Sequence, residues 1–236
     1  MSVQYPPNRI IFSSNHTSAH ESRLRFFMMW EMKSLLLCVT TCFVIITLLS
    51  GCAKKEEAKP FESKLATFGA VPQFRFTERS DRSMGLDDFK GKMWIADFIF
   101  THCAGPCPLM STEMSKLQKE FSTVANLRFV SFSVDPERDT PEVLREYASR
   151  YEASADRWFF LTGKKEELHS LAYNGFHIGD KDNPVFHSQR LILIDSYGNV
   201  RGYYDGLDAE QTARLRQELR ILIEEEKQLQ AAKASS

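Results

Sequence analysis

The apolar positions of this chain form short uninterrupted runs that alternate with segments of helical spacing. Residues 93–100 (MWIADFIF) and 127–134 (LRFVSFSV) are short and rich in β-branched and aromatic side chains, which predicts strands buried on both faces of a sheet. Residues 158–161 predict a third strand. Because a segment of helical spacing follows each run, the pattern predicts an α/β fold.

The helices expected after these strands carry apolar side chains every three or four residues. These positions are Met110, Met114, Leu117 and Phe121 in the first helix, and Val143, Leu144, Tyr147 and Tyr151 in the second. The second helix is expected to have Asp139 or Thr140 as its N-cap and Pro141 in its first turn. After the third strand, Thr162 is expected to cap a helix that ends near Gly175.

The C-terminal third predicts a hairpin and a last helix. Residues 190–195 and 200–204 read as two antiparallel strands joined by a turn at 196–199. An amphipathic helix is marked by Leu215, Leu219, Leu222 and Ile223. Residues 228–236 are expected to be a frayed tail.

An apolar segment near the N-terminus predicts export. Residues 35–49 follow Lys33 and are shorter than the roughly 20 residues of a membrane-spanning helix. They match the apolar part of a secretory signal peptide, which is followed by small residues at the cleavage point. The sequence LSGC at 49–52 resembles the lipobox of bacterial lipoproteins, which makes Cys52 the expected site of lipid attachment.

This interpretation divides the chain into four parts. Residues 1–51 are expected to be a signal peptide, of which 1–31 reads as an over-extended start, and residues 52–60 a lipid-anchored tether. Residues 61–227 form one domain, and the frayed tail follows. An uncleaved signal anchor is the alternative at the N-terminus. Both interpretations place the domain on the extracytoplasmic side of a bacterial membrane, in the cell envelope.

Composition excludes one class of partner and concentrates attention on two thiols. The chain is 43% hydrophobic and 26% charged with a formal net charge of -1, which is an ordinary globular composition without the basic excess of a nucleic-acid-binding protein. Of its five cysteines, Cys38 and Cys42 lie in the expected signal peptide. Beyond Cys52, the domain keeps Cys103 and Cys107.

Both thiols lie where a strand gives way to a helix, in the run THCAGPCP at 101–108. Pro106 and Pro108 lack a backbone N–H, which fits them to the first turn of a helix. A helix N-terminus favours the thiolate form of cysteine, so the pair is expected to be reactive. The spacing allows a disulfide, or joint binding of a soft metal such as copper(I) or zinc, with an imidazole as a third ligand.

Three motifs in the order of the chain resemble the Sco (SenC) family of copper proteins. They are FIFTHCAGPCP at 98–108, SFSVDPERDTP at 131–141, and HS at 187–188 entering the predicted strand LILID at 191–195. The resemblance covers roughly residues 60–225. It implies a thioredoxin-like three-layer α/β sandwich, in which a mixed central sheet is closed by an antiparallel hairpin.

The resemblance also implies a site and a function. Cys103, Cys107 and His187 would bind one copper ion, as Cu(I), Cu(II) or both, and Asp135 would lie near the site or contact a partner. The protein would be a copper chaperone in assembly of the binuclear copper centre of cytochrome c oxidase. Its partners would be the copper-bearing oxidase subunit and another periplasmic copper chaperone or thiol reductant.

Two departures and one alternative remain open. Ala104 stands where many family members have proline, and Phe186 stands where many have an acidic residue before the histidine. The loss of a negative charge at Phe186 would weaken copper(II) relative to copper(I), or alter which partner docks. The alternative function is that of a thiol-disulfide oxidoreductase that keeps partner cysteines reduced, which needs Cys103 and Cys107 and not His187.

Overall fold

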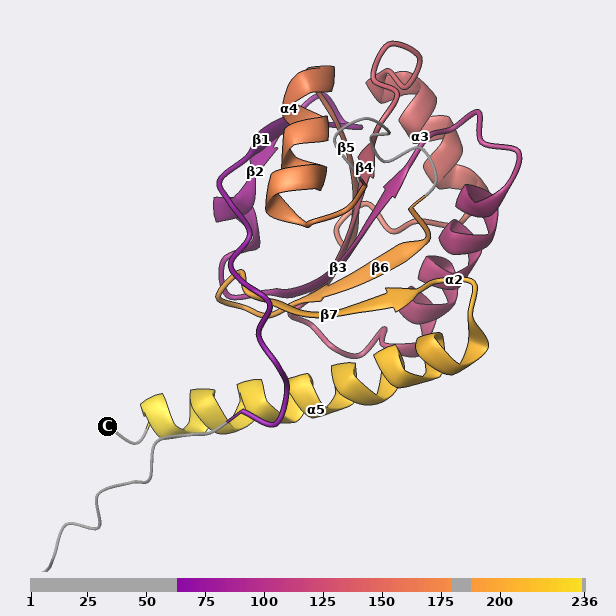
Figure 1. Cartoon of the computed structure of the whole chain (residues 1–236). Coiled ribbons are helices and arrows are strands. Elements are labelled where there is room, and N and C mark those ends of the chain that lie inside the picture. Colours follow the sequence, from indigo (N-terminus) through magenta and orange to yellow (C-terminus); the bar gives the residue numbers. More distant parts are fainter. Residues whose placement is uncertain (1–62, 180–187, 235–236) are drawn as a thin grey trace, which may run out of the picture. The chain divides into compact units, whose positions relative to one another are not determined.

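A seven-stranded mixed sheet forms the centre of the protein (Figure 1). The computed structural model describes residues 63–179 and 188–234. Its elements, in chain order, are β1 (Arg75–Glu78), β2 (Ser83–Gly85), the 3-10 helix η1 (Leu86–Phe89), β3 (Met93–Ile99), α2 (Pro106–Glu120), β4 (Leu127–Ser133), α3 (Pro141–Arg150), β5 (Trp158–Thr162), α4 (Lys165–Ser170), the π-helix η2 (Leu171–Gly175), β6 (Arg190–Ile194), β7 (Val200–Asp205) and α5 (Ala209–Ala234).

The strand order is β2-β1-β5-β4-β3-β6-β7. Strand β4 pairs in parallel with both β3 and β5, whereas β6 runs antiparallel to β3 with Ala96 opposite Ile192. Strands β6 and β7 form an antiparallel hairpin. The predicted mixed α/β sheet with its closing hairpin is therefore confirmed.

Buried side chains on the two faces of the sheet form two cores, as the continuous apolar runs predicted. All of β3 is buried, and its side chains alternate between the faces, with Trp94 in one core and Ile95 in the other. Helices α2, α3 and α5 contribute their apolar positions to the core of Ile95, and α4 and η2 contribute theirs to the core of Trp94. Two helical layers thus enclose the sheet, which confirms the three-layer arrangement.

Strands β1 and β2 were not predicted from the sequence. They form a short antiparallel hairpin whose first strand also pairs antiparallel with β5, where Thr77 lies opposite Thr162. In β1 only alternate residues are buried, Phe76 and Glu78. A strand of four residues with one apolar core position carries too weak a period to identify alone.

Pairing with β1 also explains an incorrect helix boundary. Thr162 does not cap a helix; it is the last residue of β5 and is buried. Helix α4 begins at Lys165 after Lys164, which makes no side-chain capping hydrogen bond. The predicted end of this helical segment near Gly175 is correct, because η2 ends there.

Helix α5 is longer than predicted. It continues to Ala234, although the sequence predicted a frayed tail from Gln228. Its last turns consist of Gln, Leu, Ala and Lys, which are strong helix formers that extend an existing helix. Near the end, the Lys233 ammonium donates to the Tyr197 hydroxyl over 3.0 Å. In the described parts of the chain, no helix has the length and apolar character needed to cross a membrane.

Candidate metal centre

The candidate site lies at the edge of the sheet where the parallel strands end. The chain leaves β3 at Ile99. Cys103 lies in the loop that follows, and Cys107 lies in the first turn of α2. Strand β4 ends at the same edge, where the Val134 N–H donates to the Ile99 carbonyl over 2.9 Å. Because β6 is antiparallel to β3, its first residue, Arg190, also lies at this edge. Ligands commonly bind at this edge in open α/β sheets.

The prolines place Cys107 in the first turn of α2 as predicted. The helix begins at Pro106, and the preceding residue, Gly105, has no capping side chain. The backbone N–H of Cys107 instead donates to the Sγ atom of Cys103 over 3.4 Å. Both cysteines are free thiols, with exposed fractions of 8% for Cys103 and 4% for Cys107. The pair is therefore close enough to act on one ion or in one exchange reaction.

The thiol of Cys107 is less acidic than its helix position suggests. Burial, together with a smaller contribution from the neighbouring Cys103 thiol, raises the pKa of Cys107 to about 12. The sequence favoured a thiolate because of the helix dipole, a contribution of about 1 kcal/mol. Loss of hydration at a buried thiol outweighs it. The expectation of an activated thiolate at Cys107 is therefore wrong for the metal-free dithiol form.

His187 lies outside the described residues. Among residues 63–179 and 188–234, no cluster of three or more His, Cys, Asp or Glu side chains is arranged to hold a metal ion. The described residues begin again at Ser188. The carbonyl of Gln189 accepts a hydrogen bond from the Gly206 N–H over 2.7 Å. A Cβ atom at Gly206 would lie 3.3 Å from Met110 Cγ and 3.1 Å from Leu191 Cγ. The segment entering β6 thus lies against the second turn of α2.

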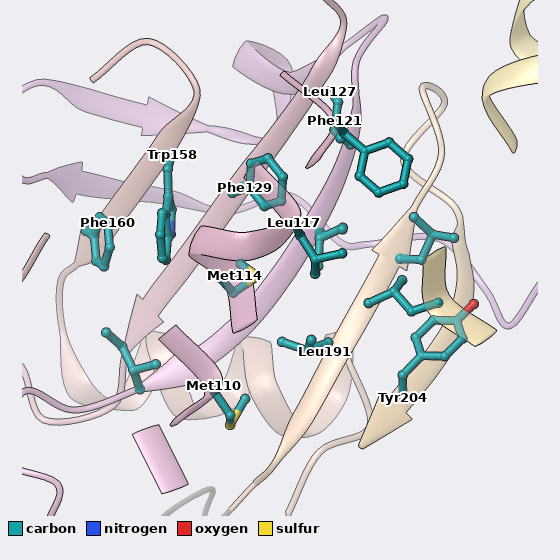
Figure 2. Packing of buried hydrophobic residues seen from close by; sticks show 14 of the residues in the cluster. Met110, Met114, Leu117, Phe121, Leu127, Phe129, Trp158, Phe160, Leu191 and Tyr204 are labelled. Atoms are coloured by element: carbon teal, nitrogen blue, oxygen red, sulfur yellow. The ribbon is translucent and has the colours of Figure 1, made fainter. Parts of the chain in front are cut away.

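The methionines of α2 are core residues, as their spacing predicted. Met110 and Met114 are fully buried and point toward the sheet with Leu117 (Figure 2). Leu191 of β6 belongs to the same cluster. These contacts fix the rotation of α2 about its axis, and with it the direction in which Cys107 is presented.

Asp135 lies at the predicted edge, in the loop after β4. Its carboxylate is 3.5 Å from the Arg138 guanidinium, and its carbonyl accepts backbone hydrogen bonds from Arg138 and Asp139. These contacts are those of a residue that closes a turn. The side chain is 15% exposed, so it lies near the surface at the level of the cysteine loop.

Asp139 has a role that the sequence did not reveal. The N-cap of α3 is Thr140, whose side chain accepts from the Val143 N–H, and Asp139 is free to turn inward. Its buried carboxylate accepts hydrogen bonds from Thr101 and Ser133. The motif contained this aspartate, but no spacing rule links position 139 to position 101.

Residues 63–179 and 188–234 contain three histidines, His102, His169 and His177. His102 is exposed, and its Nδ1 atom lies 3.1 Å from the Thr101 hydroxyl. Because that hydroxyl donates its proton to Asp139, Nδ1 of neutral His102 must carry the hydrogen in this contact. His169 contacts the Val134 carbonyl over 3.4 Å, and His177 has a positive φ of 52°.

Asp97 is a buried carboxyl that the sequence analysis did not single out. It lies at the middle of β3, fully buried, and neither carboxyl oxygen has a hydrogen-bond partner within bonding geometry. Burial raises its pKa to about 7, and the hydroxyl of Ser131, its neighbour across the parallel register, partly offsets this. The presence of an acidic residue within the apolar run 93–100 could have identified Asp97 as a buried carboxyl.

Comparisons with known proteins agree with this geometry. The SCO1/SenC family model matches residues 63–224. A SCO1 homologue of Bacillus subtilis is 33% identical over 71% of this chain and 87% of its own length. A protein of Stutzerimonas stutzeri that is named for copper binding is 32% identical over 57% of this chain and 68% of its own.

Two solved structures, each 32% identical with a TM-score of 0.60, share the fold. One is a SCO1/SenC family lipoprotein of Bacillus anthracis, matched over 67% of this chain and 97% of that one. The other is BsSco, described as a member of the Sco family of cytochrome c oxidase assembly proteins with a disulfide switch, matched over 69% and 97%. The chain therefore belongs to the SCO1/SenC family and has its thioredoxin-like fold.

Proposed function

We propose that this protein is a membrane-anchored copper chaperone of the bacterial cell envelope that serves assembly of the binuclear copper centre of cytochrome c oxidase. It carries one copper ion as cargo, held by the sulfur atoms of Cys103 and Cys107 and an imidazole nitrogen of His187. The observation that carries the proposal is the contact between the two cysteines, in which the Cys103 Sγ atom lies 3.4 Å from the Cys107 backbone nitrogen.

The donor set suits copper and suits delivery. Thiolate sulfur prefers copper(I) and zinc among the biological metals, and imidazole nitrogen binds copper in both oxidation states. Two sulfurs and one nitrogen leave a coordination position open, as in sites that exchange ligands, whereas structural sites are closed by four protein ligands. A partner can enter at that position and take over the ion. The relative from Stutzerimonas stutzeri, named for copper binding, supports the choice of metal.

The path of the chain around β6 supports His187 as the third ligand. Gln189 follows it by two residues and is bonded to Gly206, which packs against Met110. Met110 follows Cys107 by three positions, which is about one turn of α2. We therefore propose that His187, two positions before Gln189, reaches the cysteine loop.

The lipid anchor at Cys52 is the proposed link to the membrane. It depends on the apolar segment 35–49 and the LSGC sequence that follows, both outside the described residues. The Bacillus anthracis relative is a lipoprotein, which supports the same attachment here. The oxidase-assembly role named for the family of BsSco supports the same role for this protein.

A second function, thiol-disulfide exchange with partner cysteines, is favoured by one observation. Cys103 and Cys107 are both free, buried and in mutual contact, which is the arrangement of a dithiol that can close to a disulfide. BsSco is described as having a disulfide switch. Exchange requires the two sulfurs only, so the two functions separate at His187.

The test is copper binding by the full-length protein in detergent, with three variants. We expect one copper ion per wild-type chain, loss of thiolate-to-copper absorption in Cys103→Ser, and weakened binding with an altered spectrum in His187→Ala. His177→Asn is the matched control, because asparagine tolerates the positive φ at that position. It should bind as wild type. If the wild-type protein binds no copper, or if His187→Ala binds as wild type does, the proposed site is wrong.

Oxidase maturation in cells separates the two functions. His187→Ala should abolish assembly of the oxidase copper centre if delivery is the function, while its dithiol still exchanges with glutathione. Full maturation in this variant would favour thiol-disulfide exchange over copper delivery.

A further inference from the structure

The carboxylate of Asp139 joins the cysteine loop to the neighbouring loop after β4. Asp139 is fully buried. It accepts hydrogen bonds from the Thr101 backbone N–H over 3.1 Å, from the Thr101 hydroxyl over 2.5 Å and from the Ser133 hydroxyl over 2.6 Å. Thr101 lies two residues before Cys103, and Ser133 is the last residue of β4. One side chain thus connects the ends of two parallel strands at the candidate site.

These bonds restrict the turn that carries Cys103. The Cys103 N–H donates to the Phe100 carbonyl over 3.2 Å, which closes the turn around Thr101. A buried carboxylate keeps its place only when polar partners replace its lost hydration. Both polar hydrogens that Thr101 offers are used for this purpose. The turn is therefore held by its backbone and by a side chain from outside it.

The far end of the cysteine loop is fixed independently. Helix α2 begins at Pro106, and its position on the sheet is set by Met110 and Met114 in the core. Between these two fixed points only positions 102–105 remain, and within them the Cys103 Sγ atom accepts the Cys107 N–H. The position of Thr101 therefore decides where the first sulfur lies relative to the second.

We propose that Asp139 is a positioning residue that, through Thr101, holds Cys103 in the geometry shown here for the free dithiol. It touches neither sulfur, and it acts by pre-organising the loop. Two consequences follow. Loss of its bonds removes support from the dithiol form and shifts the thiol-disulfide equilibrium toward the disulfide. It also weakens metal binding, because outer contacts that orient ligands are typically worth a factor of 10 to 100 in metal affinity. The second consequence rests on the proposed copper function, and the first does not.

The sequence offers matched variants for the test. Thr101→Val removes the hydroxyl at constant shape, and Thr101→Ser retains it. Ser133→Ala removes the second hydroxyl. Its control is Ser131→Ala, which lies on the same strand and face and is equally buried, but whose hydroxyl accepts from the Trp158 indole N–H over 2.9 Å. The Ser131 hydroxyl also faces the Asp97 carboxyl, so the variants are compared at pH 6, where that carboxyl is largely protonated. Loss of the bond to Trp158 then reports the effect of a general loss of stability.

The first readout is the equilibrium of the metal-free full-length protein with reduced and oxidised glutathione. Thr101→Val and Ser133→Ala should each shift it toward the disulfide by a factor of about three to ten, the effect of one hydrogen bond. Thr101→Ser should stay near wild type, and Ser131→Ala should not shift despite lower resistance to urea. An unchanged equilibrium in Thr101→Val, or an equal shift in Ser131→Ala, overturns the proposal.

The second readout is copper(I) affinity measured by competition with a chelator. Thr101→Val should bind about tenfold more weakly than wild type, and Ser131→Ala should bind equally well. If the wild-type protein binds no copper while the glutathione equilibrium shifts as expected, the chaperone function fails and the role of Asp139 stands. If wild type binds copper and Thr101→Val matches it in both readouts, the role of Asp139 fails alone.

Discussion

The backbone N–H of Cys107 points at the Sγ atom of Cys103 and donates to it over 3.4 Å. In this arrangement a sulfur atom serves as the cap of α2, because Gly105 has no capping side chain and Pro106 has no N–H to satisfy. The Cys103 sulfur and the first turn of α2, which carries Cys107, therefore form one unit. Movement of either cysteine changes the surroundings of the other.

Burial of the pair predicts slow alkylation of the free dithiol. Because burial raises the pKa of Cys107 to about 12, only a very small fraction of this thiol is ionised at pH 8. Iodoacetamide should label Cys107 in the folded metal-free protein at least tenfold more slowly than in the urea-unfolded chain, as measured by peptide mass spectrometry. Equal rates in the folded and unfolded chains would contradict the burial of this thiol.

Asp97 predicts a decline of stability with rising pH. Its pKa is about 7 in the folded protein and about 3.9 in an unfolded chain, so the folded state binds more protons between these values. The free energy of unfolding should therefore fall as pH rises from about 4 to about 7, by on the order of 4 kcal/mol, and level off above.

Urea titrations of wild type and Asp97→Asn across this pH range test the assignment. The amide does not ionise, so the variant should lose this part of the decline whatever its stability at any one pH. A variant curve parallel to that of wild type would show that Asp97 is not the group responsible.

Among the described residues outside the site, we expect Arg201 to be the single charge whose removal lowers the free energy of unfolding most. It is 7% exposed, and its guanidinium pairs with Asp195 at 3.1 Å and Glu225 at 3.8 Å, two carboxylates that are also buried. It also donates to the carbonyls of Leu65 and Ala66, which attaches the start of the described chain to the hairpin. Arg201→Met should lower the free energy of unfolding by about 3 to 5 kcal/mol, because the two buried carboxylates lose their charged partner and keep only hydrogen bonds from neutral groups.

The control for Arg201 is an exposed ion pair. Arg150 and Glu146 lie four residues apart on α3 at 2.6 Å, with both side chains more than half exposed. Arg150→Ala should leave the midpoint of the same urea titration nearly unchanged. Similar losses in the two variants would mean that the Arg201 network contributes no more than a surface pair.

Elements with a continuous apolar run, or with a boundary set by proline, were predictable from the sequence. The run that forms β3 and the prolines that start α2 gave the correct strand and helix boundary, because each rests on local chemistry. The prediction that Thr162 caps a helix was wrong. A threonine before a helix favours capping, whereas its pairing with Thr77 is a contact between distant segments. The tail from Gln228 continues a helix that its own composition sustains.

At the site, the placement of Cys107 in a helical turn was predictable, and its environment was not. Spacing placed Cys107 in the first turn of a helix, but only the packing around it shows that burial outweighs the helix dipole. The contacts of Asp139 with Thr101 and Ser133 depend on the register of β3 against β4. No local pattern in the sequence encodes that register.

The central claim is that two cysteine sulfurs and the His187 imidazole share one copper ion, and X-ray absorption at the copper edge tests it most directly. For the copper-loaded full-length protein, the account predicts two sulfur neighbours and one imidazole nitrogen per copper. In His187→Ala the imidazole contribution should vanish while the sulfur contribution remains. An imidazole contribution that persists in this variant, or a wild-type spectrum of sulfur alone, would contradict the proposed site.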